Sequence, residues 1–221
     1  MQRIFDLFFS GISLLILSPL LLPLMVSLRL TGEGEVFFLQ SRVGKGGEFF
    51  QLYKFATMLK DSPNIGTGTV TLHKDPRVLR LGRFLRSSKV NELPQLLNIF
   101  LGDMSIIGPR PQTDRCFNAF PEEAREKIIK VRPGLSGVGS IVFRNEEEMM
   151  HDSNDPDNFY DQIVMPYKGL LEQWYVSNQN MWSYFSLIVL TVLAVVFPNA
   201  GLIFKIFDEL PSPPRELHQW M

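Results

Sequence analysis

The sequence has a single cysteine, few histidines and almost no net charge, and each of these scarcities excludes a class of protein. Because Cys116 is the only cysteine, no intrachain disulfide can form, which fits a reducing compartment. The three histidines lack the spacing of metal ligands, so we expect no zinc site. A net charge of -1 gives no overall attraction to nucleic acid, so phosphate groups would have to be bound by local clusters of charge.

Charged residues are also missing from a long stretch near the start of the chain, from Leu7 to Leu28. As a helix this stretch would be roughly 33 Å long, enough to cross the core of a bilayer. No small-residue cleavage pattern precedes Arg29, which argues against a cleaved signal peptide. Near the middle, Pro19 should kink the helix, and the hydroxyl of Ser18 can bond a carbonyl that the proline leaves free. These residues leave two topologies open, a spanning helix and a re-entrant one.

The rest of the chain divides by composition. Residues 35–184 have the composition of a globular domain, with two short strands expected around the turn Gly44–Gly47 and an amphipathic helix over 121–131. A second apolar run, 185–197, is too short to cross a bilayer, so we expect a helix that is buried or lies in the membrane interface. The predicted organisation is a membrane helix over 1–34, a globular domain over 35–184 and a membrane-associated segment over 185–221.

Basic and apolar residues alternate irregularly between Lys74 and Lys89, with Arg83 and Arg86 among them. The pattern indicates a helix that lies on a surface with its apolar side inward. Its cations could bind anionic headgroups or a diphosphate, or they could form a solvated helix face. We favour the first of these, because the basic run leads directly into the next motif.

That motif predicts a packed helix, because apolar residues between 93 and 100 recur at helical spacing. Asn91 is the expected N-cap, which would place Glu92 at the start of the helix, where N–H groups attract anions. A loop follows at Gly108-Pro109-Arg110-Pro111, where two prolines fix the backbone around one arginine. Such an arginine suits the binding of a diphosphate, although a rigid turn with an exposed arginine has the same sequence.

Several of these segments together resemble one family, the monotopic phosphoglycosyl transferases, also called the bacterial sugar transferase family. The matching motifs are Arg3-Ile4-Phe5-Asp6, Ser18-Pro19, Tyr53-Lys54-Phe55, Asp75-Pro76-Arg77, Gly82-Arg83, Glu92-Leu93-Pro94-Gln95-Leu96, Gly102-Asp103-Met104-Ser105, Gly108-Pro109-Arg110-Pro111 and Arg132-Pro133-Gly134. The resemblance extends from residue 1 to about residue 185. Gly-Asp-Met-Ser followed by Gly-Pro-Arg-Pro is its most specific part.

The resemblance implies an α/β fold that is mostly α with a small β element. It has a re-entrant membrane helix broken at Ser18-Pro19, amphipathic interfacial helices and a cytoplasmic catalytic domain on the bacterial inner membrane. It further implies transfer of a phosphosugar from a nucleotide-sugar, a UDP-sugar, to polyprenyl (undecaprenyl) phosphate with release of UMP. This is the first membrane step in assembling an O-antigen, capsule or glycoprotein glycan. The implied partners are the nucleotide-sugar, polyprenyl phosphate and membrane lipid. Downstream glycosyltransferases and a second copy of the chain are compatible with it.

The resemblance also implies roles for particular residues, carried over by position. Glu92 matches the family's catalytic glutamate, Arg110 the arginine on the substrate side, and Lys54 and Arg86 basic residues of the active site. A Mg²⁺ ion is implied at Asn91 and Glu92. Substrate binding is expected of Arg83, Arg86, Pro109, Arg110 and Pro111.

One position departs from the family, which has aspartate where this chain has Asn91. Asparagine is neutral and cannot be the carboxylate nucleophile, although its carbonyl can still bind Mg²⁺. Three alternatives follow. The enzyme is active, with Glu92 as nucleophile or with direct attack by the lipid phosphate and Glu92 as base. It is a catalytically impaired variant that keeps substrate binding. Or it is a membrane scaffold or regulator of glycan assembly.

Overall fold

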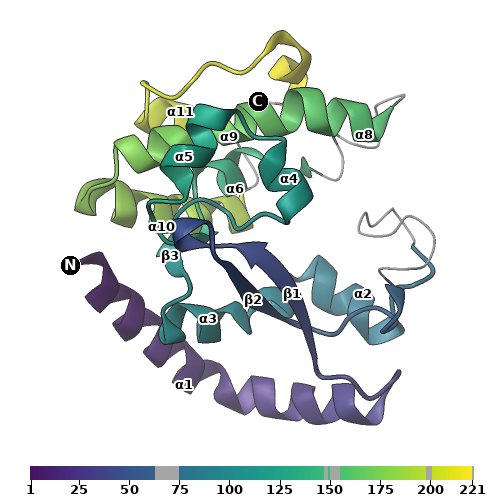
Figure 1. Ribbon diagram of the computed structural model, residues 1–221. Helices are drawn as coiled ribbons and strands as arrows, with labels where there is room; N and C mark the ends of the chain where they lie inside the picture. Colours follow the sequence, from purple (N-terminus) through teal and green to yellow (C-terminus); the bar gives the residue numbers. More distant parts are fainter. Residues whose placement is uncertain (63–74, 147–148, 150–154, 198–200, 221) are drawn as a thin grey trace. The chain divides into compact units, whose positions relative to one another are not determined.

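The computed structural model describes residues 1–62, 75–146, 149, 155–197 and 201–220. Helices dominate it, with two small two-stranded sheets, β1–β2 and β3–β4 (Figure 1). The strands are β1 (Phe37–Val43), β2 (Phe49–Phe55), β3 (Ser105–Ile107) and β4 (Gly134–Ser136). The helices are α1 (Gln2–Leu30), α2 (Arg80–Ser87), α3 (Gln95–Leu101), α4 (Asp114–Asn118), α5 (Glu122–Ile128), α6 (Val138–Val142), α8 (Pro156–Phe159), α9 (Met165–Ser177), α10 (Met181–Val196) and α11 (Gly201–Ile206). Short 3₁₀ or π-helical turns lie at Lys45–Gly47, Val90–Glu92, Tyr160–Val164 and Arg215–Trp220. The predicted class, α/β and mostly helical, is confirmed.

These elements form two compact units, each assembled from separate stretches of the chain. Unit 1 contains Met1–Asp6, Arg42–Phe50 and Gly102–Met221, and unit 2 contains Leu7–Ser41 and Gln51–Leu101. Helix α1 and strands β1 and β2 therefore contribute residues to both units. The domain limits expected from the sequence follow chain order and stay a prediction.

Helix α1 is continuous through its two prolines, Pro19 and Pro23. The hydroxyl of Ser18 donates to the carbonyl of Leu15 at 2.8 Å. That carbonyl is the one that Pro19, which has no N–H, cannot bind. The compensation expected of Ser18 is therefore present. The backbone stays helical at Ser18-Pro19 in a helix that Figure 1 shows as bent rather than interrupted.

Helix α1 buries only a narrow stripe of its surface. Leu21 and Leu28 pack with Phe55 and Leu85 in the core of unit 2. Several apolar residues on its other sides are exposed, namely Leu15, Ile16, Leu20, Leu22 and Val26. By length and composition the helix is apolar enough to cross a membrane. A continuous apolar surface of this size is suited to lipid rather than to water, so the helix fits membrane association.

The start of α1 is tied into unit 1 by a buried carboxylate. Asp6 is 2% exposed. Its Oδ1 accepts hydrogen bonds from the hydroxyl of Ser105 at 2.9 Å, the N–H of Ile106 at 3.0 Å and the hydroxyl of Tyr184 at 2.9 Å. Burial and then the negative charge of Asp6 raise the pKa of Tyr184, so the phenol keeps its proton and remains a donor. The motif that contains Asp6 thus fastens α1 to β3 and α10.

The predicted hairpin is confirmed. Strands β1 and β2 pair, and the turn between them passes through Gly46 and Gly47, which have φ angles of 76° and 80°. Positive φ is readily adopted only by residues without a Cβ, which explains the glycines.

Unit 1 is built around a short parallel sheet, in which Ser105 of β3 pairs with Gly134 of β4. Helices α6 and α10 pack against this sheet, α9 and α11 pack against α6, and all four helices share one apolar core. The sequence indicated only a turn at 132–137, because strands of three residues carry no periodic pattern. The sheet matters for the site because the loop 108–111 follows β3 directly.

Helix α10 contains the second apolar run and starts before it, at Met181. A capping box at Asn180 and Ser183 fixes this start: each side chain accepts from the N–H of the other residue, at 3.0 and 2.9 Å. One side of the helix lies in the core of unit 1. Apolar residues on the opposite side are exposed, namely Trp182, Phe185, Val189, Val192 and Val196. The helix is therefore half buried and half available to another apolar surface.

Candidate active site

The segment with Asn91 and Glu92 forms a tight 3₁₀ turn, and α3 begins only after it, at Gln95. Lys89 precedes the turn in the left-handed conformation, with φ 59°. The N–H of Glu92 donates to the carbonyl of Lys89 at 3.1 Å, so it is used within the turn. The prediction that Asn91 caps a helix is therefore wrong, and so is the placing of Glu92 at the helix start. The regular helix begins beside Pro94 instead, where the N–H that proline lacks would be unpaired in any case: the N–H of Leu97 donates to the carbonyl of Pro94 at 2.9 Å.

Asn91 is nevertheless placed as a ligand would require. It is 8% exposed, and its Oδ1 has no hydrogen-bond partner among the described residues. One turn later, the Nε2 of Gln95, a residue that is 1% exposed, is likewise unpaired within the described part of the chain. Leaving a buried polar atom unpaired costs about 1–3 kcal/mol. Such an atom marks a position where a bound group can compensate.

The donor set around Asn91 suits Mg²⁺ better than a metal held by protein alone. No cluster of three His, Cys, Asp or Glu side chains occurs in the described residues. Mg²⁺ commonly binds one or two protein oxygens and completes its shell with water and substrate phosphates. The buried Oδ1 of Asn91 and the neighbouring carboxylate of Glu92 fit that requirement.

Lys54 lies half-buried on β2, and α3 holds this strand in place. The side-chain amide of Asn98 donates to the carbonyl of Gln51 at 2.8 Å and accepts from the N–H of Tyr53 at 3.0 Å. A buried amide thus connects the strand that carries Lys54 to the helix that follows Glu92. Asn98 was not among the predicted site residues, although an asparagine inside an apolar helix is a signal of such a contact.

Arg83 and Arg86 lie one turn apart on α2, where Arg83 is exposed and Arg86 half-buried. An Nη1 atom of Arg86 lies 3.8 Å from the sulfur of Met58. The helix reaches this place because Gly82 has no side chain: a Cβ there would lie 2.1 Å from the carbonyl oxygen of Thr57. Gly82 therefore sets the position of both arginines.

The basic run is only partly a helix on a surface. Arg77 is 4% exposed and belongs to a buried ion pair, with an Nη2–Oδ2 distance of 2.6 Å to Asp75. Its Nη1 donates to the carbonyl of Ser62 at 2.8 Å. The expectation of a surface cation at Arg77 is wrong, because a short turn before α2 folds this side chain inward. Lys74 lies outside the described residues.

In unit 1, the loop that carries Arg110 is fixed along its backbone by β4. The N–H of Gly108 donates to the carbonyl of Ser136 at 2.9 Å, and the N–H of Gly134 donates to the carbonyl of Pro109 at 2.8 Å. Both glycines are required by close approach. A Cβ on Gly134 would lie 2.1 Å from the nitrogen of Gly108.

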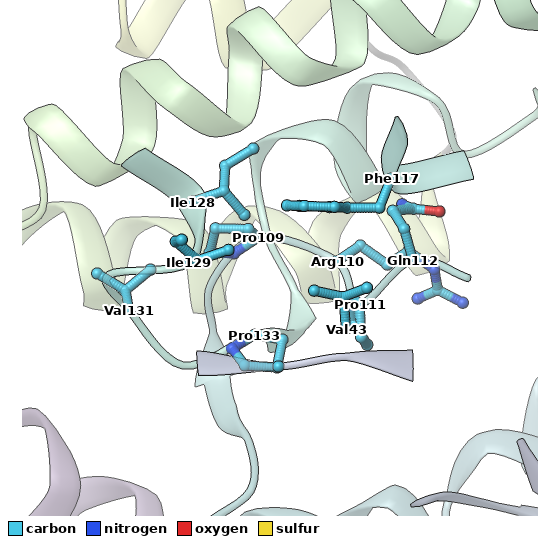
Figure 2. Close-up of a pocket in the computed structure, with 11 residues that line it drawn as sticks. Val43, Pro109, Arg110, Pro111, Gln112, Phe117, Ile128, Ile129, Val131 and Pro133 are labelled. Carbon is cyan, nitrogen blue, oxygen red and sulfur yellow. The ribbon is translucent and has the colours of Figure 1, made fainter. Parts of the chain in front are cut away.

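Arg110 itself is half-buried between two buried prolines. Its Nη1 lies 3.4 Å from the carbonyl oxygen of Leu135, and Arg42 donates to the carbonyl of Pro111 at 3.2 Å. Beside the loop is a cavity of about 10 Å³, surrounded by side chains from the loop, from the end of α5 and from Phe117 (Figure 2). This volume holds about one water molecule. A nucleotide-sugar would therefore have to be bound outside this cavity.

A residue that the sequence did not single out reaches the same loop. Glu172 of α9 is fully buried, and one carboxyl oxygen accepts from the N–H of Arg110 at 3.2 Å. Burial raises the pKa of Glu172 to about 7. No local pattern marks this residue, because its partner Arg110 lies 62 positions away in the sequence.

The predicted site residues are divided between the units. Lys54, Arg83, Arg86, Asn91 and Glu92 belong to unit 2, and Pro109, Arg110 and Pro111 belong to unit 1. The membrane-helix positions Ser18 and Pro19 belong to the part of α1 in unit 2. Their roles in binding and catalysis stay predictions.

Comparison with known proteins adds an independent observation. A family model described as bacterial sugar transferase matches residues 1–198. Over 201 residues the chain is 31% identical to an undecaprenyl-phosphate glucose phosphotransferase from Komagataeibacter xylinus, covering 89% of this chain and 36% of that protein. Over 143 residues it is 38% identical to a UDP-N-acetylgalactosamine-undecaprenyl-phosphate N-acetylgalactosaminephosphotransferase from Aeromonas hydrophila, covering 64% and 34%. Over 146 residues it is 43% identical to the exopolysaccharide production protein PSS of Rhizobium leguminosarum bv. phaseoli, covering 64% and 73%. The chain thus spans about a third of the length of the first two relatives.

Proposed function

Because this chain belongs to the bacterial sugar transferase family, we propose that it transfers a phosphosugar from a UDP-sugar to undecaprenyl phosphate and releases UMP. The observation that carries the proposal is the family match over residues 1–198, which contains every predicted site residue. Two relatives are named as phosphotransferases that act on undecaprenyl phosphate, one of them with a UDP-sugar. The product, undecaprenyl diphosphate-sugar, would start the assembly of a bacterial surface glycan.

Two routes are open to Glu92. In the first, its carboxylate attacks the phosphorus that carries the sugar. The bond from that phosphorus to the bridging oxygen breaks, and UMP leaves with the electron pair. An oxygen of undecaprenyl phosphate then attacks the same phosphorus and displaces the carboxylate. In the second, an oxygen of the lipid phosphate attacks that phosphorus directly and Glu92 accepts the proton of the lipid phosphate. The bond to the bridging oxygen breaks in the same step, and UMP leaves with the electron pair.

The cations have separate proposed roles. Arg110, held between two prolines, would bind the phosphates of the donor as a fixed guanidinium. Lys54 and Arg86 would offset negative charge that develops at the reacting phosphoryl group, and the exposed Arg83 would bind the substrate phosphates or anionic headgroups. We assign Mg²⁺ to Asn91 and Glu92, where the bound ion would neutralise charge on the donor diphosphate.

A second candidate function follows from the neutral side chain of Asn91. If Glu92 cannot replace the missing carboxylate, the protein binds nucleotide-sugar or lipid without turnover and acts as a scaffold of glycan assembly. Contacts with downstream glycosyltransferases and with a second copy of the chain are part of this candidate and stay predictions.

The two candidates separate in one assay. Purified protein is incubated with Mg²⁺, undecaprenyl phosphate and a panel of UDP-sugars, and UMP release is measured. The enzyme releases UMP with at least one donor, whereas the scaffold binds donor but releases none. Intact mass after incubation with donor alone then separates the routes, because only the covalent route adds the mass of one phosphosugar to the protein.

Two substitutions sharpen the assay. Glu92→Gln should lower turnover by about 10²–10⁴-fold, since it removes the base or nucleophile. Glu126→Gln, on the exposed side of α5, is the matched control and should leave turnover unchanged. Asn91→Asp restores a carboxylate next to Glu92, and a rise in turnover would show that the neutral residue limits the reaction. Full activity of Glu92→Gln would contradict both routes.

We further propose that α1 enters the membrane and returns to the cytoplasmic face. Each end of the helix is fixed to a folded part of the chain: Asp6 to Ser105, and Leu28 to Phe55. Strands β1 and β2 contribute to both units, and a hairpin strand of this kind does not cross a bilayer. Both ends of α1 then lie on one face of the membrane.

Cysteine labelling tests this topology. In a Cys116→Ser background, single cysteines replace Gln2, at the start of α1, and the exposed Thr31, directly after its end. A membrane-impermeant maleimide should label both in inverted vesicles and neither in spheroplasts. Labelling of one position from each side would instead establish a spanning helix.

We propose that the exposed face of α10 provides a second contact with lipid, as expected for the segment 185–221. The double substitution Val189→Glu and Val192→Glu places charge on this face without touching the core. It should reduce the fraction of the protein that floats with liposomes, because charged side chains on this face would no longer enter the lipid. The same substitutions on the buried side would unfold the protein, so retained thermal stability is the control.

A further inference from the structure

Glu172 is a fully buried acid with an unusual set of neighbours. Its carboxyl accepts hydrogen bonds from the backbone N–H groups of Arg110, at 3.2 Å, and Gly139. Its Oε2 has no hydrogen-bond partner within the described part of the chain. The carboxyl therefore accepts hydrogen bonds from backbone groups, one of them in the loop, rather than from another side chain.

The fold provides space for this carboxyl by omitting side chains around it. A Cβ on Gly139, in α6, would lie 2.5 Å from Oε1, and one on Gly137 would lie 3.5 Å from Oε2. Alanine in place of Gly139 would displace the acid, whereas alanine in place of Gly137 would clash with the carbonyl oxygen of Gly108, at 2.3 Å. The two glycines and the acid thus form one arrangement that places an acceptor under Arg110.

Nearby cations compensate the acid only in part. Lys168, one turn earlier on α9, forms its ion pair with Glu146 at 2.7 Å. The charges of Lys168 and Arg110 lower the pKa of Glu172, but burial outweighs them. Burying an acid without an ion pair lowers the free energy of unfolding, and an apolar side chain of similar size would stabilise the fold better. A group that lowers stability while holding a loop with a substrate-side arginine is best explained by function.

We propose that Glu172 is a positioning residue for Arg110 in nucleotide-sugar binding. The inference rests on the proposed function. Pro109 and Pro111 restrict the backbone on either side of Arg110, and their carbonyls accept hydrogen bonds from Gly134 and Arg42. Glu172 supplies the remaining anchor, at the N–H of Arg110 itself. A loop whose backbone is fixed at three points loses less conformational entropy when the donor binds to the guanidinium.

The anchor should respond to pH, because burial raises the pKa of Glu172 to about 7. Above that value the acid is ionised, and a carboxylate accepts hydrogen bonds from N–H groups more strongly than a neutral carboxyl does. The KM for the donor should therefore fall as pH rises from 6 to 8. The other charged or titratable groups that act on Glu172 are Lys168 and Tyr175 on its own helix and Arg110 on the loop, while α6 contributes backbone N–H.

The test combines substitutions at Glu172 with Arg110→Ala in the UMP-release assay on the full chain. Glu172→Met removes the acceptor at nearly constant volume and should raise the KM for the UDP-sugar about tenfold, with kcat less affected. Glu172→Gln keeps an acceptor oxygen, so its KM should stay within about threefold of wild type and lose its dependence on pH. Gln173→Met, the neighbouring position on α9, is the matched control and should change neither.

The double substitution decides between positioning and a merely structural role. In the Arg110→Ala background, Glu172→Met should raise KM by less than about twofold, because the residue it positions is gone. An undiminished effect in that background overturns the inference, and so does a Glu172→Gln protein with the pH dependence of the wild type. If Glu172→Met does not fold, this pH comparison decides alone. A wild-type protein without turnover overturns the proposed function, whereas turnover with additive losses overturns only the role of Glu172.

Discussion

Replacing Asp6 with alanine should destabilise the protein more than any other single change at the start of α1. The carboxylate accepts three hydrogen bonds, and its removal leaves the donors of Ser105, Ile106 and Tyr184 without it. The serine hydroxyl can rotate toward another acceptor, but the amide and the buried phenol cannot. Two buried donors left unpaired cost about 1–3 kcal/mol each. Part of this is offset because a buried carboxylate no longer has to be desolvated.

We therefore expect a loss of about 2–4 kcal/mol in the free energy of unfolding. In a chain of this size the loss corresponds to a fall in Tm of about 5–15 °C. Thermal unfolding in detergent, followed by tryptophan fluorescence, measures it.

Two controls test the reasoning for Asp6. Tyr184→Phe removes one donor, and the phenylalanine that replaces it has no polar group to leave unpaired. It should lower the free energy of unfolding by only about 1 kcal/mol. The double substitution Asp6→Ala with Tyr184→Phe should be less destabilising than the sum of the two, because the phenol is no longer left unpaired. Asp6→Ala with the Tm of the wild type, or with strictly additive effects, would refute the account of α1 as fastened by this carboxylate.

Three further outcomes are expected. Arg77→Ala leaves Asp75 charged and buried, so it should lower the free energy of unfolding by about 3–5 kcal/mol, against less than about 0.5 kcal/mol for the exposed Arg80→Ala, as measured by thermal unfolding. Gly82→Ala forces α2 away from the carbonyl of Thr57 and should cost about 1–3 kcal/mol by the same measurement, with a lower turnover because the helix carries Arg83 and Arg86. Excess EDTA should abolish UMP release and added Mg²⁺ restore it, while Tm stays constant; transfer that continues in EDTA would contradict the assignment of Mg²⁺.

Elements encoded by neighbouring residues could be predicted from the sequence. The hairpin β1–β2 follows from glycines that permit positive φ, and α5 from a proline and acids at its start. The run that forms α10 was expected from composition, while its start at Met181 depends on the capping pair Asn180 and Ser183. In each case the signal lies within a few residues of the structure it specifies.

Contacts between distant segments could not be predicted, because no local pattern sets them. The pairing of β3 with β4 joins strands too short for a period, and Asp6 finds its partners in β3 and α10. Glu172 meets the loop of Arg110 across 62 positions. The same limit applies to the basic run. The sequence pattern predicts that Arg77 lies on the surface, but the side chain is buried.

The motifs that identify the family are therefore informative for a structural reason. Gly108 and Gly134 belong to motifs far apart in the sequence, yet a Cβ on Gly108 would lie 2.6 Å from the carbonyl oxygen of Arg132. Such contact requires glycine, whatever reaction the protein performs. The two motifs therefore form one structural feature: their backbones are in direct contact, and this contact fixes the loop of Arg110. Their match identifies the scaffold of that loop, and the chemistry then depends on the side chains placed on it and on the turn with Asn91 and Glu92.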